Sequence, residues 1–247
     1  MKRKMQKNSI RHLAGILAAA IAAAALCGCA ASPMKKTRIK KALEDKYGET
    51  FFVDSIYRHS LSPGSITAQA YAAVHPDLPF LVVMDADYRS FSDGYVMKLG
   101  TQMISRRAQE NLGALKKPYY LHTQSMFPDS VSDDPGQSLE EYLSSEESNF
   151  FTIYLYINPE GETPESLYAA VRDILSGMEN MDGSLEIFLT GEGTMDKARG
   201  YVVSHASLED EYVKIGEKYH VLGVRFKSGT LGTSREEFES RLQEWMR

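Results

Sequence analysis

The side chains best suited to acid–base or metal chemistry in this chain are its histidines, and they occur singly. Beyond residue 30 they are His59, His75, His122, His205 and His220. None has the H-x-x-x-H or H-E-x-x-H spacing that places two imidazoles on one helix face. The run Asp85–Gly94 departs from a calcium-binding loop, because Arg89 and Ser90 stand where an acid or amide and a glycine belong. Since the chain also lacks a G-x-S-x-G turn for a serine nucleophile, the sequence predicts no metal site, no cofactor and no recognisable catalytic residue.

The first 29 residues have the composition of an export signal. Residues 1–12 contain five basic side chains and no acidic one, and Leu13 to Ala25 form an uncharged, alanine-rich stretch of 13 residues. This is the length of a signal h-region and is short for a helix that crosses a bilayer. The stretch is followed by the run Leu26-Cys27-Gly28-Cys29.

This segment resembles a bacterial lipoprotein signal peptide, in which a Leu-like residue lies three positions before a cysteine and a small residue directly before it. Leu26 and Gly28 match these positions, so the resemblance implies removal of residues 1–28 and lipidation of Cys29. The alternatives are a secretory peptide cut near Ala30-Ala31-Ser32 and an uncleaved anchor. Processing before Cys29 leaves no second cysteine for a disulfide, a zinc–thiolate site or a thiol nucleophile.

The charge of the chain is acidic overall and unevenly distributed. The net charge is −5, and removal of the five basic residues of the leader makes the remainder more acidic, at −10. A broadly acidic surface argues against nucleic acid and polyanionic wall polymers as main partners. No Lys or Arg lies between Pro118 and Val171, a stretch with ten acidic residues. We interpret this acidic run as a solvated surface.

A basic cluster follows the predicted lipid anchor directly. It consists of Lys35, Lys36, Arg38, Lys40 and Lys41. One interpretation is contact with anionic lipid headgroups, in which each basic side chain contributes about 1 kcal/mol near the surface. The other is a solvated tether, residues 29–35, that leads into the first helix.

The hydrophobic pattern predicts an α+β domain over residues 36–126. The expected elements are a helix over Lys36–Tyr47, strands over Thr50–Tyr57, Ser65–Val74 and Phe80–Met84, a helix over Phe91–Leu112 and a strand over Tyr119–Ser125. This α-β-β-β-α-β order is typical of a layer with its sheet on one side and its helices on the other.

Residues 127–149 are expected to form an acidic linker, because they are rich in serine and acidic residues and contain two prolines. Beyond it, residues 150–247 alternate strand and helix, which predicts a smaller α/β domain with three strands. The expected elements are strands over Phe150–Ile157, Leu185–Leu189 and Tyr219–Phe226, and helices that begin after Thr163, at Met195 and after Ser234. The fold class is therefore α+β, in two parts.

Taken together, these features resemble the uncharacterised cell-surface lipoproteins of Gram-positive-type bacteria. The similarity rests on the lipobox, on a basic first helix that ends Lys46-Tyr47-Gly48 and on the strands that begin at Phe51 and Phe151. It implies a protein held by lipid on the extracytoplasmic face of the membrane, and it implies no agreed activity. We expect a non-enzymatic binding or scaffolding module with a protein or small-molecule ligand. The alternative is a cell-envelope hydrolase whose active-site residues are dispersed along the chain.

Overall fold

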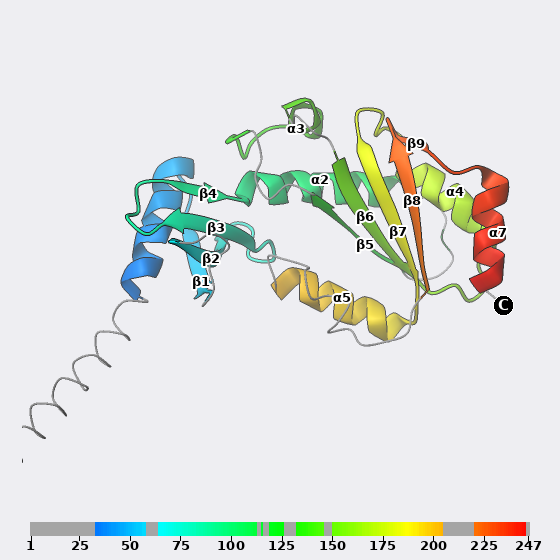
Figure 1. The fold of residues 1–247 in the computed structure, drawn as a ribbon, viewed down its shortest axis with the longest axis horizontal. Coiled ribbons are helices and arrows are strands. Elements are labelled where there is room, and N and C mark those ends of the chain that lie inside the picture. Colours follow the sequence, from blue (N-terminus) through cyan, green and yellow to red (C-terminus); the bar gives the residue numbers. More distant parts are fainter. Residues whose placement is uncertain are drawn as a thin grey trace, which may run out of the picture.

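The computed structural model describes residues 33–57, 64–112, 115, 119–125, 132–145, 150–204 and 220–245. Over these residues the chain forms two sheets, each packed against helices (Figure 1). Leu26, Gly28 and Cys29 lie outside the described residues, so the predicted lipid anchor is not part of this description. Among the described helices, none has the length and apolar character needed to cross a membrane.

The first sheet is antiparallel and is packed against the helix over residues 33–47. Its strands, in spatial order, are β1 (Phe51–Ile56), β2 (Ser65–Ala72), β3 (Phe80–Asp85) and β4 (Phe91–Asp93). The helix contributes Ile39 and Leu43 to a core that also contains Phe51 and Phe80, and all four side chains are fully buried. Their spacing in the helix places Ile39 and Leu43 on one face, as the sequence predicts.

The second sheet has five strands and helices on both faces. Its strands, in spatial order, are β5 (Tyr119–Ser125), β6 (Phe150–Ile157), β7 (Asp182–Leu189), β8 (His220–Lys227) and β9 (Thr230–Leu231). Strands β6 and β7 are parallel, and the other neighbouring pairs are antiparallel. The parallel pair is joined by α4 (Pro164–Ile174), whose first turn is fixed by the predicted cap: the Thr163 hydroxyl accepts a hydrogen bond from Ser166 N.

The large core of the second sheet lies on the face covered by α4 and α7 (Arg235–Trp245). From α7 it includes Phe238 and Leu242, both fully buried. The opposite face is aromatic, with Tyr156 and Phe188 stacked at a centroid distance of 4.5 Å. Met195 of α5 (Glu192–Ser204) packs against this pair, which places α5 on that face. Figure 1 shows α5 on the side of the sheet away from α2.

Both sheets share α2 (Tyr95–Asn111), which at 17 residues is the longest of the described helices. Tyr95 and Leu99 lie in the core of the first sheet. Ile104 and Ala108, further along the same helix, lie in the core of the second sheet. The helix begins directly after β4, where the Asp93 carboxylate accepts hydrogen bonds from Tyr95 N at 3.1 Å and from the Tyr47 hydroxyl at 2.8 Å.

The structure confirms the two-part α+β class, with differences in how the parts are built. The second sheet has five strands, where the sequence predicts three. Strand β5 pairs along its whole length with β6, so Tyr119–Ser125 belongs to the second sheet and not to the first layer, where the sequence placed it. Phe91 begins the short strand β4 rather than a helix. Strand pairing depends on contacts between residues far apart in the sequence, which local periodicity does not report.

The described part of the acidic segment, residues 132–145, is attached to both halves of the molecule. Asp133 forms an ion pair with Lys46 at 2.6 Å, and Glu140 forms one with Arg107 of α2 at 3.3 Å. The short helix α3 (Leu139–Ser145) buries Tyr142 against α2. Over these residues the chain packs on the domains that it connects.

Candidate functional site

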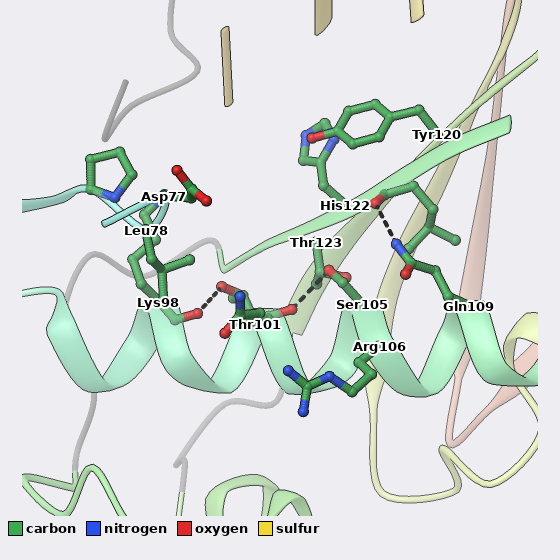
Figure 2. Close-up of a pocket in the computed structure, with 13 residues that line it drawn as sticks. Asp77, Leu78, Lys98, Thr101, Ser105, Arg106, Gln109, Tyr120, His122 and Thr123 are labelled. Carbon is green, nitrogen blue, oxygen red and sulfur yellow. Dashed lines mark hydrogen bonds between the residues drawn. The ribbon is translucent and has the colours of Figure 1, made fainter. Parts of the chain in front are cut away.

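A cavity of about 380 Å³ lies where the first sheet, α2 and the edge strand β5 meet (Figure 2). Residues 77–79, in the loop before β3, line it from the first sheet, and residues 98–109 of α2 and 120–123 of β5 line it from the other sides. A cavity of this volume has the size of a small-molecule site, and such sites commonly form where two structural units meet.

His122 of β5 is the most unusual residue in the cavity lining, because it is buried and neither ring nitrogen has a hydrogen-bond partner. Its side chain is 6% exposed. The antiparallel pairing of β5 with β6 places it opposite Tyr154, and the two rings stack at a centroid distance of 4.7 Å. Burial and the positive charge of Lys98 lower the pKa of His122 to about 3. The imidazole is therefore neutral near pH 7, with one nitrogen able to donate and the other able to accept.

Lys98 of α2 brings a positive charge to the same cavity. Its side chain is half-buried, and it forms no ion pair with any acidic residue in the described part of the chain. Loss of hydration lowers the pKa of Lys98 to about 8, which leaves the ammonium largely protonated at neutral pH. Asp77 is the acidic residue in the cavity lining, and it is exposed to solvent.

The other polar side chains of the lining fall into two groups. Thr101 and Ser105 donate hydrogen bonds to backbone carbonyls of α2, at 3.0 and 2.9 Å, and Gln109 donates to the outer carbonyl of Leu121 at 3.2 Å (Figure 2). Of these bonds, only that of Gln109 joins α2 to β5, because those of Thr101 and Ser105 lie within the helix. Thr123 differs, because its hydroxyl is buried without a hydrogen-bond partner. Thr123 and His122 are consecutive in β5, so these two unsatisfied side chains point to opposite faces of the strand and line the cavity from different sides.

The arrangement offers binding groups but no activated nucleophile among the described residues. A serine hydrolase requires a base within hydrogen-bond reach of the serine hydroxyl. Ser105 instead donates to the Thr101 carbonyl, and the ring nitrogens of His122 contact no partner. Among the described residues, no three or more His, Cys, Asp or Glu side chains form a group that could hold a metal ion.

The basic cluster lies along the helix over residues 33–47, away from the cavity lining, and most of its members have intramolecular partners. Lys40 and Lys41 form ion pairs one helical turn along, with Glu44 at 3.5 Å and Asp45 at 2.7 Å. Arg38 stacks over the ring of Tyr88 at 4.5 Å, and Lys36 donates to the Asp54 carbonyl. Lys35 occupies the first turn of the described helix.

The sequence did not single out the cavity. His122 was one of five isolated histidines, and of the others His75 lies half-buried before β3, while the side chains of His59, His205 and His220 lie outside the described residues. The one available signal was the alternation in Tyr119–Ser125, which places Tyr120 and His122 on the same face of a strand. Lys98 carried no sequence signal, because an isolated lysine in a helix is ordinary.

Comparisons with known proteins bear on the fold. No protein-family model and no curated protein matches the chain. Among solved structures, the crystal structure of a DUF5037 family protein from Ruminococcus gnavus ATCC 29149 is similar, with a TM-score of 0.62 and 19% sequence identity. The similarity covers 84% of this chain and 98% of that one. At this identity the likeness shows the fold alone, and the family of that protein is uncharacterised.

Proposed function

We propose that this protein is a membrane-anchored lipoprotein whose extracytoplasmic part is a non-enzymatic binding module, with a small ligand bound in the cavity between α2 and β5. The observation that carries the proposal is the presence of His122 and Thr123 in this one cavity, buried and without partners. Buried polar side chains in folded proteins are nearly always hydrogen-bonded. His122 and Thr123 are consecutive in β5 and therefore point to opposite faces of this edge strand, and a ligand in the cavity at that edge would supply a missing partner to either side chain.

The energetic argument favours a ligand role over a packing role. A buried donor or acceptor without a partner destabilises the folded state by about 1–3 kcal/mol. Phenylalanine and valine would fill nearly the same volume as His122 and Thr123 without that penalty. The unsatisfied groups therefore oppose stability, a pattern that recurs at functional sites.

The proposed location rests on the N-terminal sequence. Leu26, Gly28 and Cys29 match the lipoprotein pattern, and Cys29 is four residues before the first described residue, residue 33. Lipidation at Cys29 would keep this helix, which carries the basic cluster, close to the membrane surface. Lys35 and its neighbours would then add electrostatic attraction to anionic headgroups.

The test uses soluble protein comprising residues 30–247 with ¹⁵N-labelled histidine, screened by NMR against a set of neutral and charged fragments. We expect a subset of fragments to shift the imidazole signals of His122 and to leave those of His75 unchanged. Gln102→Trp, an exposed lining residue, should obstruct the cavity and abolish the shifts. Glu110→Trp, exposed on the same helix outside the lining, is the matched control. If no fragment shifts His122, the cavity is not a ligand site.

The alternative function, a cell-envelope hydrolase, draws on the presence of Ser105 and His122 in one cavity. The same protein should be screened against esterase, peptidase, phosphatase and glycosidase substrates, with and without divalent metals. We expect no turnover. Turnover that is lost in Ser105→Ala and in His122→Ala would replace the binding proposal with the hydrolase.

A further inference from the structure

The groups left unpaired in the cavity also indicate the chemistry of its occupant, on the premise that the proposed ligand site is real. We propose that the ligand presents an oxyanion, a carboxylate or a phosphate, which pairs with Lys98 and accepts a hydrogen bond from His122. The rest of the ligand would contact the apolar part of the lining, which includes Leu78, Pro79 and Tyr120.

The charge of the lining is the first argument. Two cationic residues, Lys98 and Arg106, line the cavity against one acidic residue, Asp77, which is exposed and forms no ion pair with Lys98. A partly buried ammonium without a counter-ion is unfavourable, since burial removes hydration that no carboxylate replaces. An oxyanion would supply that counter-ion and form a charge-assisted hydrogen bond, which is about twice as strong as a neutral one.

The hydrogen-bonding capacity of Lys98 and His122 is the second argument. Both residues line the same cavity, His122 from β5 and Lys98 from α2. Both can donate hydrogen bonds, and the neutral imidazole adds no second charge. This combination fits a group that carries negative charge on several oxygens better than a neutral sugar or amide.

The first arm of the test needs no ligand. Because Lys98 is an unpaired, partly buried cation, Lys98→Met should raise the melting temperature of residues 30–247. Lys227→Met is the matched control, since Lys227 is exposed on β8, three strands from β5, and should leave the melting temperature unchanged. A lower melting temperature in Lys98→Met would show that the ammonium is satisfied within the protein, which overturns the proposal.

The second arm compares three probes of similar shape: benzoate, phenyl phosphate and neutral benzamide. We expect at least one anion to bind more than tenfold more tightly than benzamide, and the tighter anion identifies a carboxylate or a phosphate ligand. The preference should disappear in Lys98→Met, persist in part in Lys98→Arg and remain in full in Lys227→Met. Binding of an anion should also raise the pKa of His122, followed by NMR, because the anion offsets the Lys98 charge.

The outcomes separate this inference from the binding module itself. If benzamide binds as tightly as the anions, or if Lys98→Met leaves the preference intact, the oxyanion class is wrong, whereas neutral fragments that shift His122 would still support a ligand site. If no fragment of any charge shifts His122, both proposals fail.

Discussion

Gly100 of α2 lies directly against the ring of Tyr142 of α3, so closely that a Cβ atom added at Gly100 would lie 2.1 Å from Tyr142 Cζ. Tyr142 is 1% exposed and also contacts Phe151 of the second sheet, at a centroid distance of 6.2 Å. The ring therefore has little room to retreat. Through this contact the acidic segment between β5 and β6 is seated on the helix that both sheets share.

We predict that Gly100→Ala destabilises the protein even though alanine is the better helix former. The gain in helix propensity is about 1 kcal/mol, whereas overpacking a buried site costs about 1–3 kcal/mol and more where the neighbours are rigid. The net effect should be a melting temperature lower by several degrees in calorimetry. Gly200→Ala, in α5 with nothing within 4 Å of the added Cβ, should leave stability unchanged or raise it. Equal effects of the two substitutions would contradict the close contact.

A second prediction concerns acid stability. The folded protein holds the pKa of His122 at about 3, against an ordinary value of 6.5. Between these pH values the unfolded chain binds a proton that the folded chain does not, so the free energy of unfolding decreases as the pH falls from 6.5 towards 3. Chemical denaturation at a series of pH values should show this decrease.

The control for the pH prediction is His122→Phe, which keeps the ring stacked on Tyr154 and removes the titrating nitrogens. The variant should be more stable than the parent protein near neutral pH, because two unsatisfied polar atoms are gone. It should also lose stability less steeply below pH 6.5. An unchanged slope would mean that other groups govern the acid transition.

The third prediction concerns which part of the chain folds alone. A fragment of residues 150–247 lacks β5, which pairs with β6, and lacks α2, which contributes Ile104 and Ala108 to the core. It should therefore be molten or aggregated, with an unpaired strand edge and exposed apolar surface. A fragment of residues 94–247 restores both elements and should melt cooperatively in circular dichroism. Cooperative melting of the shorter fragment would show that β5 and α2 are dispensable.

The fourth prediction concerns the lipid anchor. In a bacterial host that expresses the full chain, labelled palmitate should enter the protein and should be absent from Cys29→Ala, because that cysteine is the proposed site of lipid attachment. The variant should be released or left unprocessed. Cys27→Ala is the matched control and should still be labelled. Label that persists in Cys29→Ala would show that the lipid is attached at another residue.

Much of the fold was accessible from the sequence because local patterns encode it. The hydrophobic pattern predicted a first helix over Lys36–Tyr47, which the structure has over residues 33–47, and it predicted a helix that begins after Thr163, where α4 begins. The strand predicted over Phe150–Ile157 is β6, with the same bounds. Each of these signals involves residues within one or two turns of the chain.

The candidate site was not accessible, because it depends on contacts between distant residues. Lys98 and His122 meet only because α2 runs along the edge of β5, and β5 reaches that edge only by pairing with β6 across the acidic segment. The importance of His122 arises from burial without a partner, which composition and spacing do not reveal. Gly100 is similar, since its role depends on Tyr142, which lies beyond the intervening strand.

The position of α2 has a consequence for how the molecule opens. The apolar core of each sheet is completed by this helix. Separation of the first sheet from α2 therefore exposes the apolar Tyr95 end of the helix to water, and separation of the second sheet exposes the Ile104 end. Backbone amides of β2 should then exchange with deuterated solvent through openings that leave α2 on the second sheet, and those of β7 through rarer openings that separate α2 from both sheets. A ligand in the cavity touches the loop before β3 as well as β5, and it would therefore slow exchange in both sheets together.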